Sequence, residues 1–422
     1  MCVATLALGA QSGLSPRERQ LQIDSFEHVW KTVREAHWDP TLGGVDWQRV
    51  HDELRPRMDQ VKTAREARAV LVEMLARLKQ SHFNIIPFDV YEAIEEAPAP
   101  GAKRRSAGDG RTGMEVRVIG GQALVVSVEA GSEAARQGVQ PGWQITRIDG
   151  EEIGPVIAKA AGAVKQSELT LMRALLARLT GPIGEQLRIQ FRDGADQLVE
   201  RDISLVRPRG TLARFGHMPP QYVWIEWRKV PRNTGYIRFN LFLDPARLVA
   251  AFEEALKSFK TVDGIVIDLR GNPGGIGIMA AGMAGFFIDQ PDQRLGTMYM
   301  RQTSLKFVVY PRQPTYRGPL AILIDGASAS TAEIFAGGLK DLGRARIFGA
   351  RSAGAALPSL LERLPNGDGF QYAAANYISE GGKVLEGAGV TPDVEVTHTR
   401  ERLLAGRDAA LEAALDWIRA RK

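Results

Sequence analysis

The sequence predicts a multidomain protein of the α/β and α+β classes, with an N-terminal helical module, a β-rich domain and an α/β core containing a mixed sheet. Three changes of pattern along the chain indicate this order. Apolar residues recur at helical spacing from about 24 to 78, short strands separated by glycine turns follow from 112 to about 206, and strands alternate with helices from 235 to 392. Because each pattern needs its own buried core, we expect domains at 21–95, 112–207 and 208–422.

The composition is that of a folded, water-soluble protein. Hydrophobic residues make up 44% and charged residues 24% of the 422 residues, and no apolar run is long enough to cross a bilayer. The 54 Lys and Arg residues barely exceed the 49 Asp and Glu residues, and they are spread along the chain. Disordered, integral-membrane and nucleic-acid-binding classes are therefore not expected.

The N-terminus and the cysteine content bear on the compartment. Cys2 is the only cysteine, which excludes an intramolecular disulfide and a cysteine-based zinc site. The segment 1–20 opens with a short apolar run that is similar to the back half of a signal peptide but lacks its basic start. We expect an export remnant or a disordered terminus here. The corresponding location is the periplasm or another exported compartment, with the cytoplasm as the alternative.

The helical module has one apolar face and ends in a strand. In its first helix Phe26, Val29 and Val33 recur at helical spacing, and a later helix repeats the pattern up to Leu78. The β-branched residues of 81–87 then predict a strand leaving the helix end. The following segment 95–111, rich in Ala, Pro, Gly and charge, predicts a linker.

The β-rich domain carries a recognisable stretch. Residues 132–150, SEAARQGVQPGWQITRIDG, resemble the core signature of PDZ domains. Such domains bind a peptide C-terminus by adding it as a strand to the sheet, with backbone amides holding its carboxylate. The apolar stretch 169–179 predicts the helix that flanks such a groove. The resemblance implies polypeptide partners recognised through their C-termini, and it leaves homo-oligomerisation open.

In the α/β core, loops at the ends of buried strands are expected to hold the functional residues. The segment 264–269 is a buried strand that runs into RGNPGG at 270–275, and the strand 320–324 ends before a helix beginning near Ser330. Asp244 and Pro245 are the N-cap and first-turn proline of a helix over 246–259. A final amphipathic helix is predicted over 409–419.

Ser330 has a structural and a catalytic interpretation. A serine between a buried strand and a helix is exposed, and the first helix amides point toward an oxyanion formed beside it. However, Ser330 and Glu333 also satisfy the Ser-x-x-Glu pattern of an ordinary capping box. This segment alone does not decide between the two.

Three blocks together resemble one enzyme family. DLRGNPGG at 268–275, SASTAEIFAG at 328–337 and LEGAGVTPD at 385–393 are similar to the signature blocks of the C-terminal-processing, or tail-specific, and tricorn-core-like serine peptidases, in the family's order. The resemblance implies a crotonase-like α/β core with a PDZ domain, and it implies that Ser330 is the nucleophile. In the Ser/Lys branch the base is a downstream lysine, but the matching turn SAGAA at 352–356 has Ala355 at that position.

Two other lysines are candidates for the base. Lys340 lies near the end of the helix begun by Ser330, roughly 15 Å away by helical rise, so it cannot accept the serine proton. Lys383 is not excluded by spacing, but it matches no base position of the family. A Ser/Lys dyad is therefore not expected.

The tricorn-like branch offers a different set of residues. It uses a Ser-His-Ser-Glu tetrad, and this sequence has Ser81 and His82 after the helical module and Glu386 in the third block. The resemblance implies His82 as general base, with Glu386 acting through Ser81 to fix the imidazole tautomer. A lone histidine after an apolar helix is otherwise more often structural.

The expected activity is that of a serine endopeptidase. It would cleave unfolded or C-terminally recognised polypeptides through an acyl-enzyme on Ser330, with the oxyanion bound by the Thr331 amide and by an amide of Gly274 or Gly275. We expect no metal and no organic cofactor. The alternative is a non-proteolytic member of the family that binds peptides or other ligands, and the missing lysine is its best support.

Overall fold

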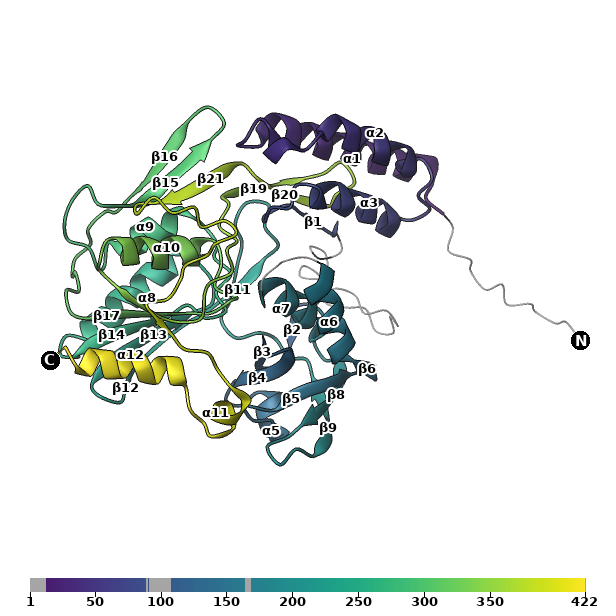
Figure 1. The fold of residues 1–422 in the computed structure, drawn as a ribbon. Coiled ribbons are helices and arrows are strands. Elements are labelled where there is room, and N and C mark those ends of the chain that lie inside the picture. Colours follow the sequence, from purple (N-terminus) through teal and green to yellow (C-terminus); the bar gives the residue numbers. More distant parts are fainter. Residues whose placement is uncertain (1–12, 89, 91–107, 164–167, 422) are drawn as a thin grey trace, which may run out of the picture. The chain divides into compact units, whose positions relative to one another are not determined.

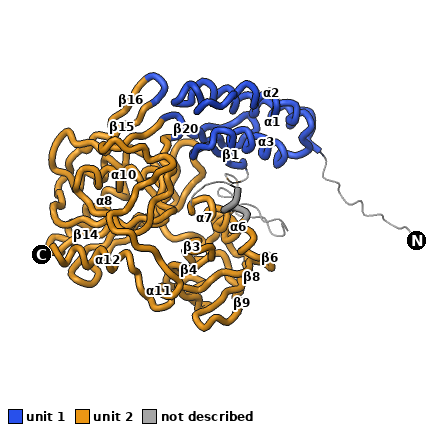
Figure 2. Tube along the Cα trace, in the orientation of Figure 1, with its two compact units in different colours: residues 1–88, 300–302, 359–375 blue, residues 89–299, 303–358, 376–422 orange. Residues whose placement is uncertain are grey.

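The computed structural model describes residues 13–88, 90, 108–163 and 168–421. The chain divides into two compact units, drawn in different colours in Figure 2. The first comprises 1–88, 300–302 and 359–375, and the second comprises 89–299, 303–358 and 376–422. The apolar run at the N-terminus and most of the expected linker lie outside the described residues.

Three helices form most of the first unit. They are α1 (Pro16–Ala36), α2 (Trp47–Met58) and α3 (Ala64–Ala76). Ser15 and Glu18 form a reciprocal capping box at the start of α1, and Thr63 caps α3 by accepting the Glu66 amide. Phe26 and Leu71 are fully buried among the facing helices. The apolar faces expected from the sequence thus form the core of this unit.

A small antiparallel sheet completes the first unit. The strand β1 (Asn84–Ile86) pairs with β20 (Gly369–Ala373), which pairs in turn with β19 (Ser359–Arg363). Arg68 on α3 forms two hydrogen bonds of 2.8 Å to the buried carboxylate of Asp368 in the hairpin between β19 and β20. A hairpin distant in sequence therefore belongs to the same core as the N-terminal helices.

The second unit contains a β-rich segment, residues 108–206. Its antiparallel sheet has the order β3-β4-β5-β8-β9, with bounds Met114–Ile119, Gln122–Val128, Gln144–Ile148, Gln186–Arg192 and Leu198–Ser204. Buried and exposed side chains alternate along β8, so one face of the sheet is in the core.

Shorter strands and three helices surround this sheet. They are β2 (Gly110–Arg111), β6 (Glu151–Glu152), β7 (Thr180–Gly181), α5 (Glu133–Arg136), α6 (Ile153–Ala163) and α7 (Glu168–Leu176). The last residues of the expected linker are thus a strand, β2, because Gly110 and Arg111 pair with β7.

The α/β core is built on a six-stranded mixed sheet. Its order is β12-β13-β14-β17-β18-β22, with bounds Ile225–Val230, Thr234–Phe239, Gly264–Asp268, Leu320–Ile324, Arg346–Gly349 and Val394–Glu395. Only the pair β12 and β13 is antiparallel. Every residue of β14 and β17 is buried, as expected for parallel strands covered on both faces.

Helices cover both faces of this sheet. One face packs against α8 (Pro245–Ser258), α9 (Ile278–Ala284) and α10 (Thr331–Asp341), and the other packs against α12 (Ala409–Arg419), seen in yellow in Figure 1. Asp244 caps α8 and Pro245 occupies its first turn, as the sequence predicts. The carboxyl ends of β14 and β17 are adjacent, which brings the loops after them together.

The remaining elements are short or lie at the edge of the core. They are η1 (Leu42–Gly44), β10 (Thr211–Ala213), β11 (Gln221–Val223), β15 (Arg294–Met300), β16 (Ser304–Val308), β21 (Ala375–Ser379) and α11 (Arg400–Leu404). None of the helices in the described ranges is both long and apolar enough to cross a membrane.

Candidate active site

Two loops of the second unit are joined at the carboxyl ends of the parallel strands. Asn272, in the loop after β14, accepts the Ala329 amide on its carbonyl at 3.0 Å. The Thr331 hydroxyl donates to the carbonyl of Gly275 at 3.0 Å. These bonds hold the RGNPGG loop against the start of α10. The first two of the three blocks that suggested a peptidase are therefore adjacent in space.

Ser330 has a strained backbone at the N-terminus of α10. Its φ of 53° and ψ of −119° lie outside the regions that a residue with a side chain normally adopts. Strain of this kind is stored at functional sites, and a sharp strand-to-helix turn exposes the nucleophile of many hydrolases. Ser330 is half-buried, and its amide donates to the Ala355 carbonyl at 2.8 Å. The surrounding hydrogen bonds thus hold the turn in place.

Glu333 organises the backbone around Ser330. Its fully buried carboxylate accepts the Ser330 amide at 2.9 Å, the Ser352 hydroxyl at 2.6 Å and the amides of Gly354 and Ala355 at 2.8 and 3.0 Å. Burial raises the pKa of Glu333 to about 7, although all four of these hydrogen bonds act to lower it. The capping interaction expected from the sequence is therefore part of a larger buried network.

The amides next to Ser330 are candidates for an oxyanion site. Gly274 lies so close to Ser330 that a Cβ atom at this position would be 2.7 Å from the serine Cβ. The Gly274 amide itself donates to the side chain of Asn272 at 2.9 Å. Among the hydrogen bonds between described residues, none is donated by the amides of Gly275 or Thr331. These two amides are the ones that remain for a ligand oxygen.

The position expected for a lysine base and the two other candidate lysines have interactions of their own in the structure. Ala355, at the position of the expected lysine, is buried and bonded through its carbonyl to the Ser330 amide. Lys340 donates to the Thr391 carbonyl at 2.6 Å and pairs with Asp393. Lys383 is mostly exposed and pairs with Asp341 at 3.1 Å. Both lysines are thus engaged in other interactions.

Glu386 lies beside the segment that contacts Ser330. Its carboxylate accepts the Ala356 amide at 3.0 Å, and the next residue, Gly387, donates its amide to the Gly354 carbonyl at 2.8 Å. The third block is therefore joined to residues 352–356, which surround Glu333. The second unit thus brings Ser330 and Glu386 to the same short segment, residues 354–356.

The Ser81 and His82 pair lies in the first unit, between α3 and β1. The Ser81 hydroxyl is 2.7 Å from Nδ1 of His82, and His82 has a positive φ of 61°. The preceding residue, Gln80, is held by a 2.9 Å hydrogen bond to the buried ring of His37. Contacts within the first unit therefore hold the side chains of Gln80, Ser81 and His82 on this turn.

Several residues that shape this site were not anticipated from the sequence. They are Arg117, Glu168, Asn272 and Asp325, together with the network role of Glu333. Asp325 and Asn272 do follow buried strands, which is a weak signal of function. Nothing in the local pattern marks Arg117, because it lies inside an ordinary strand of the β-rich segment.

Two family models match parts of this chain. Residues 233–396 match the model of peptidase family S41, and residues 23–76 match that of the tricorn protease C1 domain. The carboxyl-terminal-processing protease of Picosynechococcus sp. is 26% identical over 418 residues, covering 96% of this chain and 92% of that protein. The chloroplastic carboxyl-terminal-processing peptidase 3 of Arabidopsis thaliana is 25% identical over 376 residues, covering 87% of this chain and 68% of that protein.

Solved structures with a similar fold include a C-terminal processing protease and CPAF. The photosystem II D1 C-terminal processing protease has a TM-score of 0.59 at 21% identity and covers 94% of this chain and 99% of its own. Mature CPAF complexed with lactacystin has a TM-score of 0.63 at 13% identity and covers 95% of this chain and 98% of its own. The chain therefore carries a peptidase family S41 domain over 233–396 and a tricorn C1 domain over 23–76, and it is a homologue of the carboxyl-terminal-processing proteases.

Proposed function

We propose that this protein is a serine endopeptidase with a Ser-His-Ser-Glu tetrad formed by Ser330, His82, Ser81 and Glu386. The observation that carries the proposal is the strained Ser330 at the head of α10, next to amides that remain for an oxyanion. Ala355 in place of a lysine favours a histidine base over a Ser/Lys dyad. The Ser81 and His82 pair supports the choice of His82.

The reaction follows the chemistry of acyl transfer. The Ser330 hydroxyl attacks the scissile carbonyl carbon while Nε2 of His82 takes its proton. The negative oxygen of the tetrahedral intermediate accepts hydrogen bonds from the Thr331 and Gly275 amides, at the positive end of α10. Collapse breaks the C–N bond, and the imidazolium returns the proton to the leaving amine. Water then repeats the sequence and releases the acyl group.

Glu386 and Ser81 would set the tautomer of the base. For Nε2 to accept a proton, Nδ1 of His82 must carry the hydrogen and donate it to the Ser81 oxygen. The Ser81 hydroxyl must then donate elsewhere, and a carboxylate is the acceptor that enforces this direction. We assign that role to Glu386, which also stabilises the imidazolium once it forms.

The β-rich segment would bind the substrate. The resemblance of residues 132–150 to a PDZ domain supports capture of a polypeptide C-terminus by strand addition. The names of the carboxyl-terminal-processing relatives point to the same class of substrate. The proposed substrates are therefore unfolded polypeptides, or polypeptides with an accessible C-terminus.

Cleavage of an unfolded protein and labelling by a fluorophosphonate test the proposal together. Ser330→Ala should abolish both, and His82→Ala should reduce both by about a thousandfold or more. The matched controls are the exposed Ser304→Ala and the partly exposed His28→Ala, which should retain the wild-type rates. Activity that persists in Ser330→Ala would reject the nucleophile. A wild-type protein that binds peptides without cleaving them would favour the non-proteolytic alternative.

A further inference from the structure

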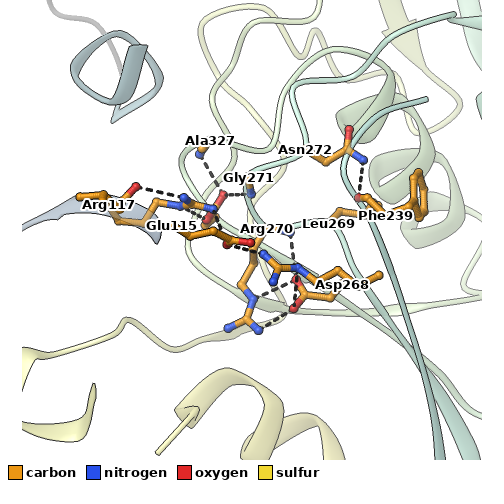
Figure 3. Close-up of polar contacts among 12 residues, drawn as sticks. Glu115, Arg117, Phe239, Asp268, Leu269, Arg270, Gly271, Asn272 and Ala327 are labelled. Carbon is orange, nitrogen blue, oxygen red and sulfur yellow. Dashed lines mark hydrogen bonds and ion pairs between the residues drawn. The ribbon is translucent and has the colours of Figure 1, made fainter. Parts of the chain in front are cut away.

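Asp325 connects the two loops of the candidate site through one oxygen atom. Its Oδ1 accepts the amide of Gly271, in the loop after β14, at 2.9 Å and the amide of Ala327, in the loop after β17, at 3.0 Å. Figure 3 labels Gly271 and Ala327 and draws these two contacts as dashed lines to one carboxylate oxygen. Gly271 lies four residues before the candidate oxyanion residue Gly275, and Ala327 lies three residues before Ser330. A shift of this carboxylate would therefore move both loops.

The second oxygen of Asp325 is held by the β-rich segment. Arg117 on β3 donates from Nε to Oδ2 of Asp325 at 2.8 Å, and the Arg117 side chain is only 9% exposed. Its guanidinium also lies against the α-carbon of Gly271, where a Cβ atom would be 2.1 Å from a terminal nitrogen. Burial alone would raise the pKa of Asp325, but the Arg117 charge and the amide hydrogen bonds bring it below its ordinary value.

A second contact from the β-rich segment reaches the same loop. Glu168 at the start of α7 lies against Gly326, where a Cβ atom would be 2.0 Å from its carboxylate. Leu169 and Met172 of α7 form an apolar cluster with Ala327, Ala329 and Ala355. The loop that leads to Ser330 is thus packed on one side by residues of the β-rich segment. These contacts distinguish the loop from an ordinary surface turn.

We propose that Arg117 and Asp325 are positioning residues for the reaction on Ser330. The Arg117 cation orients the Asp325 carboxylate, and the carboxylate fixes the spacing between the oxyanion loop and the nucleophile loop. Catalysis then depends on how the β-rich segment sits on the core, although no atom of Arg117 touches the reacting groups. This inference rests on the proposed peptidase function.

The expected effect is on turnover more than on substrate binding. Correctly placed oxyanion donors act mainly in the transition state, so their misplacement lowers kcat while changing KM little. Asp325→Asn can keep its one oxygen for the two amides, but it then presents an NH2 group, which cannot accept a hydrogen bond, to Arg117. We expect kcat to fall by about 10- to 100-fold and KM to change by less than about threefold. Arg117→Gln should give a loss of similar size.

A double-mutant cycle tests whether the two residues act through one another. The variant carrying both Arg117→Gln and Asp325→Asn should be no slower than the slower single variant, because both changes interrupt one route. The matched control is Asp196→Asn, which neutralises the 2.8 Å ion pair between Asp196 of the same segment and Arg400 of α11 but leaves Arg117 and Asp325 untouched. It should retain kcat within about twofold.

The results separate this inference from the proposed function. Multiplicative losses in the double variant, an equal loss in Asp196→Asn, or wild-type kcat in both single variants would overturn the positioning role. If Asp325→Asn does not fold, Arg117→Gln carries the same comparison.

If wild type neither cleaves nor labels at Ser330, the proposed function fails. Hydrogen exchange then still measures the positioning: Asp325→Asn should speed exchange in peptides 269–276 and 326–331, and unchanged exchange would overturn it.

Discussion

The carboxylate of Glu333 accepts a hydrogen bond of 2.9 Å from the main-chain amide of Ser330 while it is itself fully buried. The Glu333 side chain therefore supports the strained turn of Ser330. It also binds residues 352–355, the segment in which the lysine base of the Ser/Lys branch would be expected. Burial raises its pKa to about 7, so its charge changes within the pH range in which a histidine base also titrates.

Glu333→Gln should change the pH dependence of stability. A carboxyl whose pKa is raised on folding binds more protons in the native state, so its contribution to the free energy of unfolding is present at low pH and is lost as pH rises from about 4.5 to about 7. Glutamine has no charge to titrate, so this part of the slope should disappear in urea unfolding curves between pH 5 and 8. The exposed Glu254→Gln is the control and should keep the wild-type slope. An unchanged slope in Glu333→Gln would contradict the assignment.

Glu168→Gln should stabilise the protein above neutral pH. Burial, followed by the charge of Asp325, raises the pKa of Glu168 to about 7. At pH 8 the wild-type carboxylate is ionised beside Asp325, whereas the glutamine is neutral. The free energy of unfolding should rise by roughly 1–3 kcal/mol at pH 8 and by much less at pH 5. Thermal unfolding at the two pH values measures this difference, and equal shifts at both would argue against titration of Glu168.

Gly274→Ala should inactivate the enzyme because it leaves no room beside the nucleophile. Its φ of 99° is strained for alanine, and the new methyl group would be 2.7 Å from the Ser330 Cβ. Gly382 has a similar positive φ of 75° but open space around its α-carbon, so Gly382→Ala imposes the strain alone. We expect about a 100-fold or greater loss of kcat/KM in the first variant and about 1 kcal/mol of destabilisation with retained activity in the second. Similar activities in the two would remove the steric argument.

Ser81→Ala and Glu386→Gln should impair the base without removing it. In the proposed tetrad each change would disturb the tautomer that leaves Nε2 of His82 free to accept the serine proton, so kcat should fall by about 10- to 1,000-fold and the pH profile of kcat/KM should shift. Lys383→Ala is the control, because this lysine pairs with Asp341 and should not contribute to turnover. A large loss in Lys383→Ala with wild-type rates in the other two would point to a lysine base.

Local pattern was sufficient to predict many of the elements. The capped helix after Asp244, the buried strands ending at Asp268 and Ile324, and the terminal helix over Ala409–Arg419 occur where spacing and capping chemistry predict them. Each depends on interactions within a few turns or on burial of both faces, and both leave a signature in the sequence. The three family blocks identified the peptidase family for the same reason, because their motifs are local.

Contacts between distant parts of the chain were not predictable in this way. Nothing in residues 359–373 indicates that β19 and β20 continue the sheet of β1, because strand pairing depends on a partner nearly 300 residues away.

One local feature was not predictable either. The bond from the Gly274 amide to Asn272, which leaves Gly275 as the loop's candidate oxyanion donor, depends on the local turn geometry. Propensity and spacing do not specify that geometry.

The sequence by itself determined the order of the elements, the family and the candidates Ser330 and His82, because motifs and periodicity record short-range requirements. Only the tertiary structure decided that Glu333 is a buried acceptor for four donors and that Arg117 reaches Asp325 across 208 positions of sequence. The physical reason is that burial and charge pairing act through space. The energy of a carboxylate is set by the atoms packed around it, and these come from segments that the order of residues does not bring together.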